Sequence, residues 1–156
     1  MYDVLDICSF IITYCNDKNY SITNLRLQKM LYFIQLYFLD LKEEPCFDSL
    51  IEAWQLGPVL PTAYFTYRSN GANEILSIPT KNTKLIPIEQ KDEKIIRGIL
   101  DKLSQYSTYQ LVDITCHQMP WKKNYLPCAR NKIPLKDLKE FVVERRKDVL
   151  VWKEKL

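Results

Sequence analysis

The segment from residue 24 to residue 41 constrains the fold more than any other, because it has helical periodicity and apolar residues around most of its circumference. Thr23 can cap its first turn, and Ile22 and Leu27 occupy the positions of a hydrophobic staple. Two narrow polar stripes lie on nearly opposite sides of it: Asn24, Gln28 and Gln35, within about 40° of one another, and Arg26, Lys29 and Asp40. We predict a helix buried on most sides at the centre of the fold, whose first stripe can hydrogen-bond the loops that cover it.

Further helices are predicted on either side of this segment, from apolar residues at helical spacing or, for 61–69 and 108–114, from Pro61 in a first turn and Thr108 as a cap. Their ranges are 3–16, 61–69, 89–103, 108–114 and 135–156. Residues 47–55 fit either a short helix or an extended segment, residues 75–88 suit a small edge hairpin, and residues 115–134 are expected to be irregular. The expected fold class is mainly α: a compact single domain over residues 1–156 with a central buried helix and, at most, a small β-hairpin.

Composition narrows the kind of protein. Hydrophobic residues make up 47% and charged residues 26% of the chain, which is typical of a globular protein and not of a disordered one. The net charge of +3 is small for a nucleic-acid binder, so nucleic acid is not an expected partner. The chain begins without the basic region of a secretion signal, and the apolar segment 25–41 carries three charges, which excludes a membrane span. The five cysteines contain no C-x-x-C pair, so we expect reduced thiols in the cytoplasm.

The chain has one histidine, His117, and a Ser–His or Cys–His mechanism would have to use it. Its sequence neighbour Cys116 would point elsewhere on a regular element, whereas Cys128 could approach it in space. A zinc site formed by Cys116, His117 and Cys128 would need Cys46 or a carboxylate as its fourth ligand, and the spacing matches no usual zinc pattern. We therefore expect a buried or capping histidine, no catalytic residue, no metal and no cofactor.

The C-terminal helix is basic, with Lys or Arg at positions 145, 146, 147, 153 and 155. Because Glu144, Asp148 and Glu154 intersperse these cations, a solvated amphipathic face is a better interpretation than a nucleic-acid contact. Its apolar stripe is incomplete, so the helix could also dock a partner. The stripe consists of Leu135, Leu138, Val142, Val149, Trp152 and Leu156.

Two tryptophans stand beside rigid turns: Trp54 precedes Gly57-Pro58, and Trp121 follows Pro120. Each could simply pin a loop onto the core. Exposed tryptophans and tyrosines are also the residues most often found at binding hot spots. The sequence leaves both interpretations open.

Three motifs carry a family resemblance that covers nearly the whole chain. The first is Thr23-Asn24 followed by Leu27-Gln28-Lys29-Met30-Leu31-Tyr32-Phe33; the second is Glu52-Ala53-Trp54 with Gly57-Pro58-Val59, Pro61 and Tyr64; the third is Leu111, Thr115 and Pro120-Trp121-Lys122. Together they resemble the Panacea domain, found in SocA-like and GepA-like antitoxins of bacterial and phage toxin–antitoxin systems. The third motif departs from the family pattern, in which histidine directly follows the threonine: here Cys116 takes that place and His117 comes one residue later.

The resemblance implies an antitoxin and not an enzyme. Members of this family neutralise toxins, some by binding the toxin directly and one as an adaptor that delivers its toxin to a protease. The implied partner is a cognate protein toxin, with a cellular protease as the alternative. Besides the C-terminal helix, the implied partner-binding residues are Gln28, Lys29, Tyr32, Trp54, Tyr64 and Trp121. The motif residues expected to support the fold are Thr23, Asn24, Gly57, Pro58, Thr115, His117 and Pro120.

Overall fold

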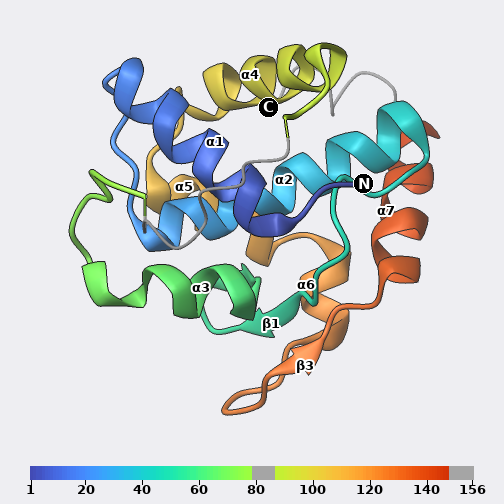
Figure 1. The fold of residues 1–156 in the computed structure, drawn as a ribbon. Helices are drawn as coiled ribbons and strands as arrows, with labels where there is room; N and C mark the ends of the chain where they lie inside the picture. The colour runs from blue at the N-terminus through green and yellow to red at the C-terminus, as the bar shows by residue number, and fades with distance from the viewer. Residues whose placement is uncertain (79–86, 148–156) are drawn as a thin grey trace.

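A computed structural model of the chain describes residues 1–78 and 87–147 (Figure 1). Its elements are α1 (Val4–Asp17), α2 (Asn24–Lys42), β1 (Glu52–Trp54), β2 (Gly57–Val59), α3 (Pro61–Tyr67) with a 3-10 turn (Arg68–Asn70), α4 (Gln90–Leu103), α5 (Thr108–Cys116), α6 (Met119–Asn124), β3 (Asn131–Lys132) and α7 (Leu135–Lys147). The mainly α fold class is confirmed.

Helix α2 lies at the centre of the molecule, as predicted. It packs against α1, α3, α4, α5, α7 and β2, and Figure 1 shows it running between α4 on one side and α3 with β1 on the other. Every residue from Leu27 to Leu36 is buried, most of them completely. The Thr23 hydroxyl accepts a hydrogen bond from the Arg26 amide at 3.3 Å, so the predicted N-cap is present.

The small sheet differs from the expected one. Residues 47–55 contribute an extended segment, and β1 pairs antiparallel with both β2 and β3 in the order β2-β1-β3. Gln55 and Leu56 form the tight turn between β1 and β2, after which Gly57 adopts φ +95°. The partner strand β3 comes from the segment 115–134 that was expected to be irregular, which also contains α6. Local pattern could not reveal β3, because it has two residues and pairs with a strand far away in the sequence.

The predicted hairpin over residues 75–88 falls largely outside the described residues, as do Val149, Trp152 and Leu156 of the C-terminal stripe. The Ile75 amide donates to the Ile22 carbonyl at 2.8 Å, so the described start of this segment lies along the entry to α2. Within α7, Leu138 and Val142 are buried, and Leu135 is partly exposed. None of the helices in the described residues is both long and apolar enough to cross a membrane.

Candidate functional site

The first polar stripe of α2 is buried and binds backbone groups of neighbouring segments. The Gln28 side chain donates to Asn24 Oδ1 and accepts from the Leu60 amide, both at 2.9 Å. Asn24 in turn donates to the carbonyl of Tyr64 at 3.0 Å. These bonds attach the start of α3 to α2, which is the structural role expected for this stripe.

Gln35, two helical turns beyond Gln28, holds the segment that follows α2. Its Oε1 accepts from the amides of Cys46 at 2.9 Å and Phe47 at 3.3 Å, and its Nε2 donates to the Phe47 carbonyl at 3.1 Å. One side chain thus satisfies three buried backbone groups of a chain reversal.

Lys29 is completely buried beneath the β1–β2 turn. Its Nζ donates to the Pro58 carbonyl at 2.8 Å. Burial lowers the pKa of Lys29 to about 7, because taking the ammonium out of water disfavours its charged form. The turn lies so close that a Cβ added to Gly57 would stand 2.8 Å from Lys29 Nζ and 2.6 Å from Thr115 Oγ1. Glycine is therefore required here both by its positive φ and by the lack of space.

Tyr32 connects α2 to the junction between α5 and α6. Its hydroxyl donates to Gln118 Oε1 at 2.9 Å, and complete burial raises the pKa of the phenol. Pro120 is buried in the first turn of α6, where its missing amide costs nothing, and Thr115 is buried with its hydroxyl on the Val112 carbonyl. These residues also hold the fold together.

Three of the six side chains expected to contact a partner, Gln28, Lys29 and Tyr32, are therefore 0% exposed. They offer no surface to another protein in this structure, and their polar atoms bind within the chain. The family motif could not show whether these side chains bond within the chain or contact a partner, because the same motif residues on α2 are compatible with either role. Of the six expected contact residues, only Trp54, Tyr64 and Trp121 therefore remain candidates for contact with a partner.

The remaining three, Trp54, Tyr64 and Trp121, lie together and are partly exposed. The Trp54 ring meets Tyr64 edge to face with centroids 4.8 Å apart, and the Trp121 indole N–H donates to the Trp54 carbonyl at 2.8 Å. Phe65 adds an edge contact to Tyr64 at 5.3 Å, and Tyr125 stacks on Trp121 at 4.3 Å. We call these five residues the aromatic cluster. It combines β1, α3 and α6, three elements that are separate in the sequence.

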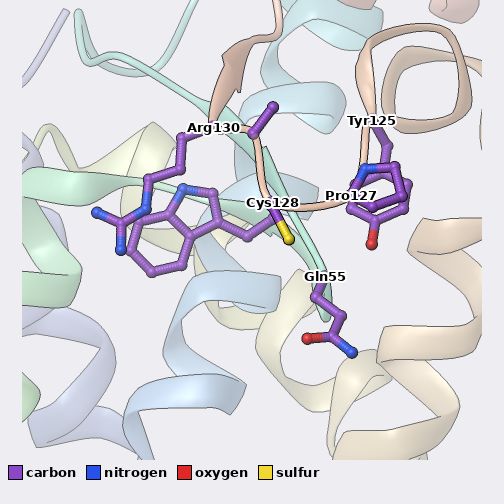
Figure 2. A pocket seen from close by; sticks show the side chains of 7 residues that line it. Gln55, Tyr125, Pro127, Cys128 and Arg130 are labelled. Atoms are coloured by element: carbon purple, nitrogen blue, oxygen red, sulfur yellow. The ribbon is translucent and has the colours of Figure 1, made fainter.

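A groove of about 420 Å³ lies beside the aromatic cluster (Figure 2). It is bordered by the β1–β2 turn and by the loop that follows α6, through Trp54, Gln55, Tyr125, Pro127, Cys128, Ala129 and Arg130. In Figure 2, Cys128 lies between Arg130 on one side and Tyr125 with Pro127 on the other. The Arg130 guanidinium covers the Trp54 ring, with its carbon 4.3 Å from a ring centroid.

Sequence reasoning missed Phe65, Tyr125 and Arg130. Phe65 directly follows the motif residue Tyr64 in the predicted helix 61–69, and this position was the one available sign that it could join the same surface. Arg130 carried no signal, because its position over Trp54 depends on the pairing of β1 with β3, which local pattern did not predict.

His117 is the C-cap of α5 and is largely exposed. Its Nδ1 lies 2.8 Å from the Asp113 carbonyl, a contact within one helical turn. Cys46 is buried, Cys116 is partly buried and Cys128 is exposed. Across the described residues, no three His, Cys, Asp or Glu side chains gather closely enough to hold a metal ion. The structure thus assigns His117 the capping position that the sequence allowed, and does not bring the considered zinc ligands together.

Comparison with known proteins identifies the family of this chain. The family described as "Antitoxin SocA-like, Panacea domain" matches residues 27–122, which span α2 from its second turn through most of α6. Antitoxin SocA of Caulobacter vibrioides (strain NA1000 / CB15N) is 35% identical over 102 residues, which cover 60% of this chain and 54% of that protein. The chain thus spans about half the length of this curated relative. No solved structure matches. All three motifs fall mainly within the matched range, and the chain belongs to the Panacea-domain family of SocA-like antitoxins.

Proposed function

We propose that this chain is an antitoxin that neutralises a cognate protein toxin by binding it directly, and that the aromatic cluster contributes to the contact surface. The observation that carries this proposal is the gathering of Trp54, Tyr64 and Trp121, three residues within the family-matched range, at one partly exposed place. The other proposed contact residues of the matched range, Gln28, Lys29 and Tyr32, are buried and have internal structural roles, so the cluster holds the proposed contact residues that remain accessible.

The chemistry of the cluster suits a protein partner. Tryptophan and tyrosine bury large apolar areas with few rotatable bonds, and they dominate the binding free energy of many interfaces. Phe65 and Leu56 are each 45% exposed near Trp54, so apolar surface continues beyond the motif residues. An exposed apolar patch of this kind is a common sign of an interaction site.

The rest of the proposal concerns the chain as a whole. One hydrophobic core joins residues from Val4 in α1 to Val142 in α7, which supports a single domain over residues 1–156. We propose that it acts in the cytoplasm, where the thiols of its cysteines stay reduced, and that its role is stoichiometric binding without catalysis or a cofactor. The C-terminal helix is a second candidate contact, since Val143 on its described part is half exposed.

The test begins with co-expression of this chain and the protein encoded by the neighbouring gene. Growth would be measured first, and the complex would then be purified through a tag on this chain. We expect growth rescue and a stable complex for the wild type. Phe65→Ala should weaken the complex without unfolding the chain, because the side chain is partly exposed. Tyr109→Ala, on the exposed face of α5, is the matched control and should retain the complex.

The outcomes separate direct binding from the alternative role. Rescue that occurs without a complex and disappears in a protease-deficient host would identify a proteolytic adaptor. If Phe65→Ala and a Trp54→Ala variant of confirmed fold both kept full affinity, the contact surface would lie elsewhere on the chain.

A further inference from the structure

The groove beside the aromatic cluster has a distinct electrostatic character. Residues 118–136, which run from α6 through β3 to the first residues of α7, contain five Lys or Arg residues and no Asp or Glu. Among the described residues, Lys123 is paired with Asp137 and Lys136 with Glu140, whereas no carboxylate forms an ion pair with Arg130. Figure 1 shows the loop that leads into β3 projecting away from the helices, so this basic segment is presented at one end of the molecule.

Arg130 is held in a position suited to bind an anion. Its guanidinium lies over the face of Trp54, with the carbon 4.3 Å from a ring centroid. Stacking occupies the planar face of a guanidinium and leaves the N–H groups at its edge free to donate. Two parallel N–H donors match the two oxygens of a carboxylate, a geometry that lysine cannot reproduce.

The Glu52 carboxylate, on the same strand as Trp54, is already hydrogen-bonded. Glu52 Oε2 accepts from the Trp54 indole N–H at 2.7 Å, which fixes the ring beneath Arg130. Glu52 also stands opposite Lys132 in the β1–β3 register. Glu52 thus serves to orient the platform, and the outer edge of Arg130 remains available.

The remaining walls of the groove are apolar or neutral. Tyr125, Pro127 and Ala129 supply apolar surface on the loop side, and Gln55 supplies an amide at the β1–β2 turn. A volume of about 420 Å³ can hold a few side chains but not a folded element. The shape and charge therefore complement a short extended segment that has one acidic residue beside an apolar one.

We infer that this groove binds an acidic side chain, aspartate or glutamate, within an extended segment of the toxin, with its carboxylate on Arg130 and a neighbouring apolar side chain against Tyr125 and Pro127. This inference rests on the proposed function for the identity of the partner. A nucleic-acid phosphate is the competing anion. Proteins that bind nucleic acid usually carry a strongly basic, clustered surface, whereas the net charge of this chain is only +3, so we favour the carboxylate.

A toxin-independent experiment tests the groove itself. A phage-displayed library of random heptapeptides would be selected on the full chain and counter-selected on Arg130→Gln. We expect the survivors to share an Asp or Glu next to an apolar residue and to shift the indole N–H signals of Trp54 and Trp121 in NMR spectra. Replacing that acid by its amide, or Arg130 by Gln, should each weaken binding about tenfold, the value of one charge-assisted hydrogen-bonded pair.

The controls keep the outcome decisive. Lys94→Gln removes a cation from the exposed face of α4, at the opposite end of the molecule in Figure 1, and should leave peptide affinity unchanged. Arg130→Gln should melt within a few degrees of the wild-type temperature, because Arg130 is exposed and an exposed cation–π contact contributes little to stability. If the selected peptides were all removed by the counter-selection on Arg130→Gln, or if the survivors shared no acidic residue, the inference would be overturned. Arg130-dependent binding of a labelled single-stranded oligothymidine that displaces the peptides would assign the groove to nucleic acid.

The partner assignment is tested separately with the toxin. If the wild type fails to neutralise the neighbouring protein, the proposed function fails while the peptide result still decides the chemistry of the groove. If the wild type and Arg130→Gln bind the toxin equally well, the antitoxin role stands and the inference that the toxin occupies this groove is overturned.

Discussion

The buried polar side chains of α2 and the aromatic cluster both include residues of the family motifs, yet these side chains have different roles. Gln28, Lys29 and Gln35 direct their polar atoms at backbone groups inside the chain. The Trp121 indole N–H donates to the Trp54 carbonyl, and both side chains stay partly exposed at the surface. Matching a motif therefore shows which family a chain belongs to, but not which residues meet a partner.

The difference also suggests how the two regions depend on each other. Lys29 donates to the Pro58 carbonyl, and Gln28 accepts from the Leu60 amide, so these two buried side chains of α2 fix the segment that follows the β1–β2 turn. Trp54 lies on β1, just before that turn. The buried residues thus set the position of the surface ones, and the predictions below separate the two roles by their expected effects on the free energy of unfolding.

The largest effect is expected for Gly57→Ala. The new Cβ would lie 2.6 Å from Thr115 Oγ1, and the residue would have to keep φ +95°. Backbone strain and overpacking together should lower the free energy of unfolding by about 4 kcal/mol, measured by urea denaturation. Gly71→Ala is the matched control, because Gly71 also has positive φ but no atom within 4 Å of an added Cβ. Equal losses for both variants would show that the close contact at Gly57 has no energetic consequence.

The second prediction concerns Gln35→Leu, which preserves side-chain size and removes all three hydrogen bonds to Cys46 and Phe47. Leaving these buried backbone groups unpaired should cost about 3 kcal/mol of unfolding free energy. Gln105→Leu, an exposed position, should change the same quantity by less than about 0.5 kcal/mol. A loss at Gln35 as small as that at Gln105 would mean that water replaces the missing partners.

The third prediction is a pH dependence caused by Lys29. Its pKa is lowered to about 7 in the folded chain and returns to its ordinary value near 10.5 on unfolding. Between these values the unfolded chain binds more protons, so the free energy of unfolding should rise with pH. Lys29→Met removes this contribution, and the difference between wild type and variant should change by about 2 kcal/mol in favour of the wild type from pH 7 to pH 9.

Taking the difference between the two proteins cancels the titration of the shared cysteines and tyrosines that do not interact with Lys29. Cys116 is the exception, because burial raises the pKa of its thiol and the Lys29 ammonium opposes that rise. Burial raises the pKa of Cys46 and of Tyr67, each to about 12, so these groups oppose the rise at alkaline pH in both chains. A difference that stays constant from pH 7 to pH 9 would show that Lys29 is charged in the folded chain.

A feature of the fold or of the candidate site could be predicted from the sequence when residues close together in the chain determine it. Thr23, the apolar periodicity of α2 and the hydrogen-bonding role of Asn24, Gln28 and Gln35 follow from helical geometry, and all were predicted. The β1–β3 pairing joins residues about eighty positions apart, and the groove and the position of Arg130 depend on it. Spacing along the chain carries no information on such contacts, so the location of the aromatic cluster was visible only as separate tryptophans.

The fourth prediction tests whether Trp121 positions the surface or only belongs to it. Trp121→Phe keeps an aromatic ring against Tyr125 but removes the donor to the Trp54 carbonyl. We expect a loss of about 1 kcal/mol in unfolding free energy, the usual net contribution of one hydrogen bond. The fluorescence of Trp54 should also change, because its strand is no longer fixed from α6. An unchanged spectrum and stability would mean that packing alone holds this part of β1.

The smallest effect is expected for His117→Ala, although His117 is the only histidine of the chain. Its ring is largely exposed and contacts the Asp113 carbonyl within the same helix, so its removal should change the free energy of unfolding by less than about 0.5 kcal/mol. If the chain neutralises its toxin by binding alone, the variant should also rescue growth fully when co-expressed with the neighbouring protein. A variant that folds with wild-type stability, binds the toxin and yet fails to rescue growth would contradict neutralisation by binding alone. If the wild type still rescued growth in the protease-deficient host, such a loss would point to chemistry performed by His117 and not to a lost protease contact.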